Sequence, residues 1–199
     1  MIYFDNILND IRIGKPVVLV DDMDREAEGD LVIAAQCANA YNLAFMLKHG
    51  RGLMCIPCLG KILDTLNIPM MQTNKLDKFS TPFTVSVDSV LGTSGISVLD
   101  RLKTIRVFLN PDSAPEDLSQ PGHMFPLRAK PGLLKERRGH TESSLELVMA
   151  AGFSPVSVII EIMNEDGTVA KGQQLIDYSK IYNLNLLRVQ DLYSQLYEK

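Results

Sequence analysis

Short apolar runs alternate along the chain with segments in which apolar residues recur at helical spacing. The runs predict buried strands at residues 17–20, 31–35, 53–56, 84–87 and 156–163. The helical spacing predicts helices over residues 5–13, 40–48, 61–67, 97–109 and 143–151. Residues 173–197 complete the pattern with a helix, a strand and a helix. The chain therefore mixes both kinds of element along its whole length.

Turn-forming residues indicate where several of these elements end. Gly50 is expected to stop the second helix, and the Asp166-Gly167 pair predicts a tight turn after a strand. Residues 110–121 are rich in Pro, Asp and Ser and are expected to be irregular. Ser143 and Glu146 have the spacing of a capping box. With no repeat or linker, the prediction is an α+β fold, an α/β-type mixed sheet flanked by helices, in a single domain over residues 1–199.

The composition is that of an ordinary soluble globular protein, with 46% hydrophobic and 22% charged residues. A net charge of −4 argues against a general nucleic-acid binder. The apolar runs are far shorter than a membrane-spanning helix, and the start of the chain does not resemble a secretory leader. Three cysteines are too few for a disulfide scaffold. We therefore expect a cytoplasmic protein with no nucleic-acid or membrane partner.

An acidic run at residues 21–30 holds six carboxylates in ten residues. Such a run is commonly a solvated face, but this one is held between two apolar strands. Clustered carboxylates repel one another unless a cation or proton neutralises them, so a divalent metal site is the natural hypothesis. Arg25, within the run, either pairs with these acids or holds an anionic ligand.

A second cluster, residues 137–142, lies immediately before a predicted helix. The first turn of a helix offers unpaired backbone N–H groups and the positive end of the helix dipole. With Arg138 and Thr141, this segment makes a phosphate site plausible. His140 is either part of that site or an ordinary surface histidine.

Four further residues are candidates for a chemical role. His123 lies in a predicted rigid turn that would fix an imidazole for proton transfer, or it is simply a loop residue. Glu161 interrupts an apolar strand, so it lies either at a wet edge or buried with a raised pKa. Cys55 and Cys58 have the spacing of a redox dithiol, but packing as small apolar residues is the favoured interpretation.

Taken together, the chain resembles the 3,4-dihydroxy-2-butanone 4-phosphate synthase family over nearly its full length. The matching motifs are DDMDREAEGDL (21–31), TVSVD (84–88), SGIS (94–97), PGHMFPLRA (121–129), RGHTE (138–142) and EIMNEDG (161–167). The resemblance implies conversion of D-ribulose 5-phosphate into the four-carbon ketone phosphate and formate, a lyase reaction of riboflavin biosynthesis. It also implies a homodimer with its sites at the subunit interface.

The resemblance further implies roles for individual residues. Glu26 and His140 would bind the metal, Mg²⁺ or Mn²⁺, with about two ions per site. His123 and Glu161 would be the acid–base residues. The substrate would contact Arg25, Glu26, Asp30, Arg138, Gly139, His140, Thr141, Glu142 and Glu161. Cys55 matches a cysteine near the family's site.

The acidic run departs from the family pattern at two positions. Met23 stands where an acid is usual, and Ala27 stands where an asparagine is usual. Neither is an implied metal or acid–base position, so the departures bear on loop geometry and metal affinity more than on reaction type. Two other functions remain open at this point: a metal-dependent phosphohydrolase, and a non-catalytic module that binds a metal or a sugar phosphate.

Overall fold

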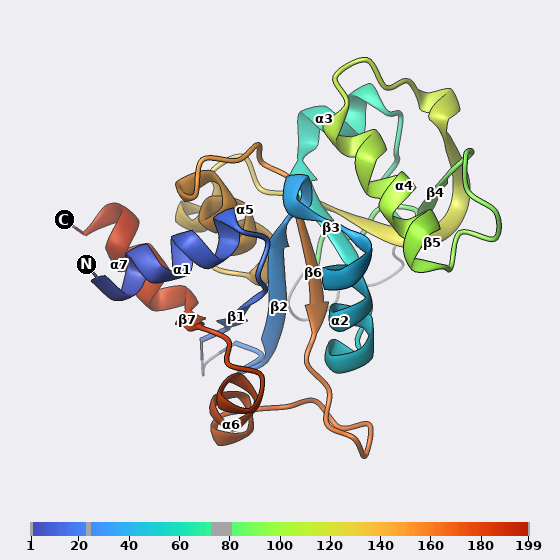
Figure 1. Cartoon of the computed structure of the whole chain (residues 1–199). Helices are drawn as coiled ribbons and strands as arrows, with labels where there is room; N and C mark the ends of the chain where they lie inside the picture. Colours follow the sequence, from blue (N-terminus) through green and yellow to red (C-terminus); the bar gives the residue numbers. More distant parts are fainter. Residues whose placement is uncertain (1, 23–24, 73–80, 199) are drawn as a thin grey trace.

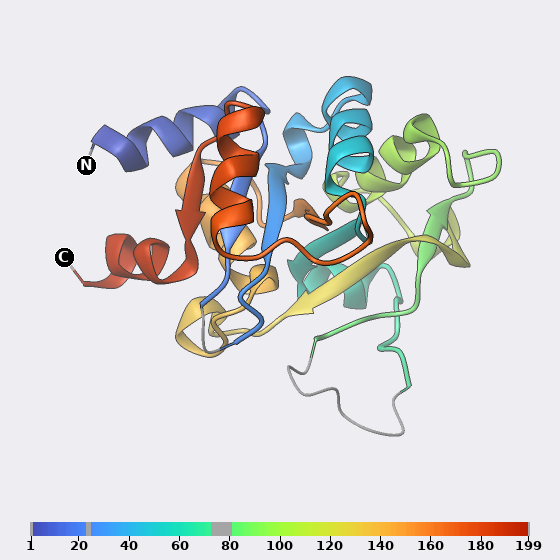
Figure 2. The ribbon, with the colours of Figure 1, turned by 90° about the horizontal axis from the view of Figure 1, so that it is seen from below.

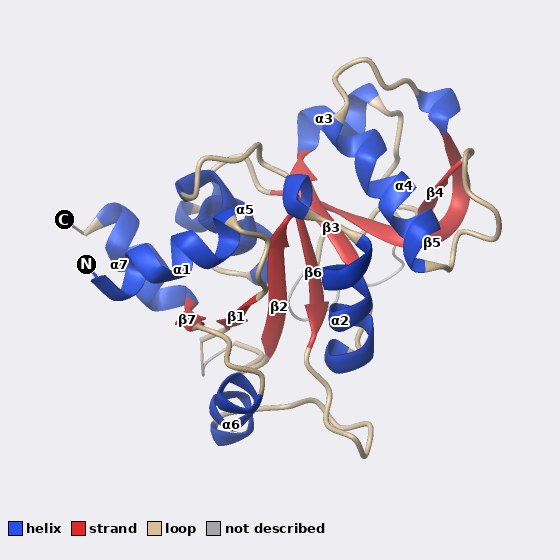
Figure 3. Cartoon of the chain, viewed as in Figure 1, coloured by secondary structure: helices blue, strands red, loops and turns tan. Residues whose placement is uncertain are grey.

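The computed structural model describes residues 2–22, 25–72 and 81–198. Within these residues a mixed sheet of seven strands, in the order β4-β5-β3-β6-β2-β1-β7, forms the centre of the molecule (Figure 3). Strand β3 is parallel to β5 and β1 is parallel to β7, whereas β2 is antiparallel to both β1 and β6. The strands are β1 (Val17–Val20), β2 (Gly29–Ala34), β3 (Cys55–Leu59), β4 (Val87–Ser89), β5 (Leu118–Ala129), β6 (Ser157–Glu161) and β7 (Leu186–Arg188).

Helices cover both faces of this sheet (Figure 1). One face packs against α1 (Ile2–Arg12), α5 (His140–Ala150) and α7 (Val189–Tyr197). The other packs against α2 (Ala40–Gly50), α3 (Gly60–Thr65), α4 (Val98–Leu109) and α6 (Gln173–Ile181). Figures 1 and 2 place the two ends of the chain on the same side, beside α1 and α7. Of the helices in the described ranges, none has the length and apolarity to cross a bilayer.

The alternation of side chains along β2 explains the two-sided arrangement. Leu31 and Ile33 enter one apolar core, and Val32 and Ala34 enter the core on the opposite face. Because successive strand residues point to opposite faces, an uninterrupted apolar run requires cover on both. The predicted mixed sheet flanked by helices is confirmed.

Strand β5 differs from the sequence prediction because its pairing is not local. Residues 110–121 were expected to be irregular, but β5 begins at Leu118, after a short 3₁₀ turn at Pro115–Asp117. Ser89 pairs with Leu118 and Asp88 with Ser119, so strand β4 imposes the extended conformation. His123 therefore lies within a strand and not in a turn. The strand predicted at 84–87 is also shifted, to Val87–Ser89.

The start of one helix was also predicted incorrectly, whereas the end of another was predicted correctly. Helix α5 begins at His140, with Gly139 as its N-cap, so Ser143 and Glu146 lie inside the helix and form no capping box. Instead, the Ser143 hydroxyl donates to the Gly139 carbonyl, and Glu146 accepts from the backbone N–H of Leu134. Helix α2 ends at Gly50, but the left-handed residue after it is Arg51, with φ of 72°.

The side chain of Asn42, in α2, ties three segments together. Its amide donates to the carbonyls of Gly14 and Cys37 and accepts from the backbone N–H of Asn39. Asn42 is buried, so its loss would leave backbone groups without partners. We expect Asn42→Ala to lower the free energy of unfolding by about 2 kcal/mol, measured by urea denaturation. Its exposed neighbour gives the control: Tyr41→Ala should change stability by less than about 0.5 kcal/mol, and equal losses would contradict this assignment.

Candidate active site

The connection between β1 and β2 carries the acidic run. It is closed by the pairing of Val20 with Gly29 and by a hydrogen bond from the Asp21 N–H to the Glu28 carbonyl. Ala27 has φ of 55°, in the left-handed region that Gly, Asn and Asp favour. Met23 and Asp24 lie outside the described residues. This tight connection turns the side chains of Asp21 and Glu26 toward the start of α5.

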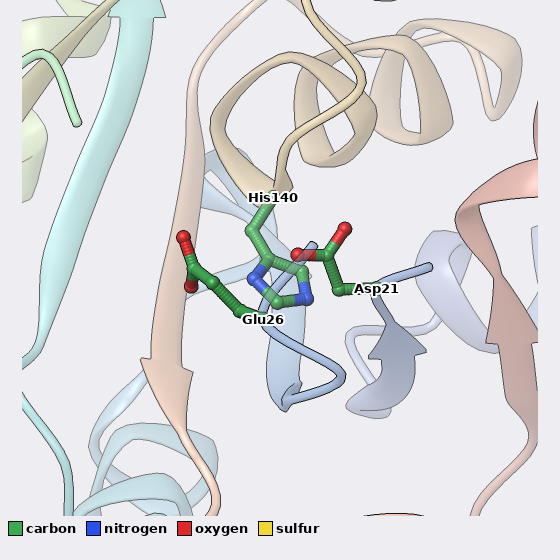
Figure 4. A group of neighbouring side chains, drawn as sticks. All are labelled: Asp21, Glu26 and His140. Carbon is green, nitrogen blue, oxygen red and sulfur yellow. The ribbon is translucent and has the colours of Figure 1, made fainter. Parts of the chain in front are cut away.

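Asp21, Glu26 and His140 form a cluster whose potential ligand atoms all lie within 4.8 Å of one another. Figure 4 shows the His140 imidazole, at the first residue of α5, lying between the two carboxylates. Burial lowers the pKa of His140 to about 4, so the ring is neutral near pH 7. The ring hydrogen-bonds to the backbone of Leu19, and its buried Nε2 has no hydrogen-bond partner within the described part of the chain. A neutral imidazole with one free nitrogen beside two carboxylates suits a divalent cation.

Asp30 and Glu161 bring two more carboxyl groups to the same place. They are directly paired across β2 and β6, and Asp30 is almost fully buried. Burial raises the pKa of Asp30 well above its usual value, and the nearby Glu161 raises it further. Burial also raises the pKa of Glu161, although hydrogen bonds from backbone N–H groups, including that of Leu53, partly oppose this effect. Both groups hold a proton more readily than free carboxyls do.

These residues surround a cavity of about 140 Å³. Its described lining combines charged groups with an apolar floor: Arg25, Glu26, Asp30, Cys55, Thr81, Phe83, Leu127, Arg137, His140, Thr141, Ile159 and Glu161. Arg25 forms ion pairs with Asp21 and Glu26, which partly balances the acidic charge. The cavity therefore presents carboxylates, two guanidinium groups and an imidazole to any small molecule that enters it.

The side chains of the two arginines before α5, Arg137 and Arg138, lie in different surroundings. Arg137 lines the cavity and pairs with the fully buried Glu142 at 2.6 Å. Arg138 instead stacks over the Tyr193 ring, at 3.9 Å from its centroid, and donates to Gln190 at 2.7 Å. Among the described residues, Arg138 is therefore not part of the cavity wall, although the sequence assigned it to the substrate.

The rest of the predicted segment divides between site and scaffold. Thr141 lines the cavity, and Gly139 is the N-cap of α5. The Glu142 carboxylate accepts hydrogen bonds from the Lys130 backbone N–H and from the Arg137 guanidinium. Its position supports Arg137 and does not face the cavity.

His123 stands apart from this cavity, of which it is not a lining residue within the described chain. It lies on β5, where its Nδ1 is 2.6 Å from the Oδ2 of Asp88 and its backbone N–H donates to Oδ1 of the same carboxylate. Nearly half of the His123 side chain is exposed. One chain by itself therefore holds Glu161 and His123 in two separate places.

Cys55 and Cys58 are both buried thiols. Cys55 lines the cavity, and burial together with Glu161 and Asp30 raises its pKa well above the usual value. Burial also raises the pKa of Cys58 strongly. Thiols held in the protonated form are poor nucleophiles, which argues against the redox interpretation.

Sequence reasoning left out several residues that the structure brings to the site. Asp21 belonged to the acidic run but had no assigned role, and Arg137 was passed over for its neighbour. Thr81 and Phe83 lie before β4, far in sequence from both the acidic run and the start of α5, and they also line the cavity. Asp21 could have been found from its place directly after a buried strand, but we see no local signal for Thr81 or Phe83.

Comparison with known proteins gives a consistent result. The family model of 3,4-dihydroxy-2-butanone 4-phosphate synthase matches residues 5–195. The chain is 39% identical to the synthase of Serratia proteamaculans, covering 98% of this chain and 91% of that protein. It is 48% identical to riboflavin biosynthesis protein RibBA of Synechocystis sp., covering 96% of this chain but 35% of that protein. It spans between 35% and 52% of the length of six curated relatives.

A solved structure is similar throughout. It is a 3,4-dihydroxy-2-butanone 4-phosphate synthase in complex with two magnesium ions, with a TM-score of 0.90, 34% sequence identity, and coverage of 98% of this chain and 96% of that chain. The family match and this likeness extend over nearly the whole chain and include every segment that lines the cavity. The chain belongs to the 3,4-dihydroxy-2-butanone 4-phosphate synthase family.

Proposed function

We propose that this protein converts D-ribulose 5-phosphate into 3,4-dihydroxy-2-butanone 4-phosphate and formate, using a divalent metal. The observation that carries the proposal is one small cavity that is lined by Glu26, His140, Glu161 and Arg137. Asp21 completes a cluster with Glu26 and His140 beside it. Membership of the synthase family supports this substrate over other sugar phosphates.

Glu26 and His140 would hold the metal, with Asp21 as a third ligand. The neutral, buried imidazole and the adjacent carboxylates fit a divalent cation, Mg²⁺ or Mn²⁺. When bound, such an ion polarises the substrate carbonyl and stabilises enediolate charge. The complex of a similar synthase with two magnesium ions supports divalent-metal binding, and we expect about two ions per site.

Arg137 and the start of α5 would bind the phosphate. The guanidinium is oriented by the buried Glu142, and Thr141 lies in the first turn of the helix beside it. A cation together with a helix N-terminus is a favourable anion site. The phosphate would then serve as a handle that orients the reacting carbons, and these would lie between Arg137 and Glu161, which line the same cavity.

Glu161 would carry protons for the reaction. Loss of one carbon from a ketose phosphate requires enolisation, dehydration, migration of the carbon skeleton and hydrolytic release of formate, and each step moves a proton. A carboxyl whose pKa is raised by burial holds a proton more readily than a free carboxyl does, which suits a group that must accept and return protons. Asp30 pairs with Glu161 across the sheet and lines the same cavity, so it would lie close to the substrate.

His123 would complete the site from a second copy of the chain. Exposed apolar side chains lie in the segment that follows Asp88, the ion-pair partner of His123: Val90, Leu91, Ile96 and Leu99. Such a face is costly to leave in water and favours contact with another copy. In the resulting homodimer, His123 of one chain would act with Glu161 of its partner.

Formate release from D-ribulose 5-phosphate tests the proposed function. We expect formate, detected by NMR, in the presence of Mg²⁺ and none after EDTA treatment. Glu26→Gln and His140→Gln should each weaken Mn²⁺ binding, measured by calorimetry, by more than about tenfold. His49→Gln, which removes a histidine outside the cavity, is the control. Release of free phosphate would indicate a phosphohydrolase instead, and binding without turnover would indicate a non-catalytic module.

A heterodimer of two inactive variants tests the shared site. His123→Ala and Glu161→Gln chains with different tags are co-expressed, and the mixed dimer is purified. If the two residues come from different chains, one site of the mixed dimer is intact, so we expect about half of the wild-type kcat. A mixed dimer as inactive as either parent would mean that both residues act within one chain.

Matched lysine substitutions distinguish the two arginines. Arg137→Lys keeps the charge beside Glu142 but loses the forked geometry, so KM for D-ribulose 5-phosphate should rise about tenfold or more. Arg138→Lys alters an exposed contact with Tyr193, and its KM should stay within about twofold of the wild-type value. Steady-state kinetics measures both, and the reverse order would restore Arg138 as the phosphate ligand.

A further inference from the structure

The segment between α2 and β3, residues 50–53, lies against the end of β6. Arg51 forms an isolated bridge with Ile162, and the Met163 N–H donates to the Gly50 carbonyl at 2.8 Å. The Arg51 guanidinium also donates to the Met163 carbonyl at 3.0 Å. These contacts fix the backbone of the segment beside Glu161, although the left-handed conformation of Arg51 is itself unfavourable.

Two features of this segment act directly on the Glu161 side chain. The Leu53 N–H donates to Oε2 of Glu161 at 2.7 Å. Gly52 leaves the space that the carboxylate occupies, because a Cβ there would lie 2.8 Å from both the Cβ and the backbone N of Glu161 and nearer still to Oε2. A larger residue at position 52 must therefore displace either the carboxylate or the strand.

We propose that Gly52 and the backbone N–H of Leu53 are positioning elements that hold the Glu161 carboxylate in the cavity. Glu161 is at the end of β6, so the sheet fixes its backbone but not its side-chain torsions. The hydrogen bond from the Leu53 backbone N–H restricts those torsions. Gly52 has no side chain that would occupy the space of the carboxylate. This inference rests on the proposed role of Glu161 in proton transfer, and neither Gly52 nor Leu53 is among the described residues that line the cavity.

The restriction has a specific kinetic consequence. A misplaced proton-transfer group slows the chemical step, whereas the phosphate contacts at Arg137 are unchanged. Variants of the segment should therefore lower kcat much more than they raise KM. A substitution that only lowered the stability of the fold would not lower kcat relative to KM in the protein that remains folded.

Two matched pairs of variants test the proposal. Leu53→Pro removes the N–H donor, and Leu53→Ala, which keeps it, is the reference for the lost side chain. Gly52→Ala adds the obstructing Cβ. Gly167→Ala is the reference for a destabilising glycine-to-alanine change, because alanine is strained at a φ of 85° but nothing lies within 4 Å of the added Cβ. In each pair we expect the first variant to have a kcat about 100-fold below that of its reference, with KM within about threefold.

Equal kcat values within either folded pair would overturn the proposal. If Gly52→Ala does not fold, the Leu53 pair still decides the result. An NMR measurement on metal-free protein is independent of turnover: the Leu53 amide proton should shift upfield in Glu161→Gln, while the amide of Ile105, in α4, stays in place. An unmoved Leu53 amide would refute the contact. If the wild-type protein releases no formate, the proposed reaction fails, and this amide shift alone decides the positioning contact.

Discussion

The pairing of Asp30 with Glu161 across β2 and β6 is the constraint on which the site depends. Both strands are buried on two faces, so the register that fills the two apolar cores also sets two carboxyl groups side by side. Burial raises the pKa of both carboxyl groups, and the charge of Glu161 raises the pKa of Asp30 further. The core and the unusual protonation chemistry are therefore products of the same strand register.

The remaining charges are arranged around this pair so that few are left uncompensated. Arg25 pairs with Asp21 and Glu26, Arg137 pairs with Glu142, and Lys171 lies 3.5 Å from Glu28. His140 stays neutral because protonation inside the protein is costly. What remains is a set of carboxylates and one imidazole nitrogen facing a cavity, an arrangement that a cation would stabilise.

The sequence predicted those parts of the molecule that depend on local pattern. Strand β1 was predicted with its observed bounds, and the final helix, strand and helix are present, because apolar runs and turn residues lie in the segments themselves. Strand β5 was missed because its start at Leu118 depends on pairing with Ser89, and nothing near Leu118 signals it. Glu26, Asp30, His140, Thr141 and Glu161 were predicted as site residues and do share one cavity, since each borders a strand or helix end.

Arg137 and Arg138 show where sequence reasoning reaches its limit. Adjacent residues in an extended segment point in opposite directions, and the sequence does not say which one faces the cavity. Contacts with other residues determine which arginine faces the cavity. The buried Glu142 pairs with Arg137, and Tyr193 and Gln190 of α7 hold Arg138 outside. His123 poses the same problem at a larger scale, because its partner in the reaction is expected on another chain.

The departure of the acidic run from the family pattern at Ala27 has a conformational explanation. With φ of 55°, position 27 requires a left-handed backbone, which asparagine adopts readily and alanine does at a cost of about 1 kcal/mol. The loop is held in spite of this, by the Asp21–Glu28 backbone hydrogen bond and by Lys171, which donates to the Glu26 carbonyl at 2.8 Å. An asparagine at this position would thus serve the backbone, and its absence does not prevent Glu26 and His140, the proposed metal ligands, from lying in one cluster.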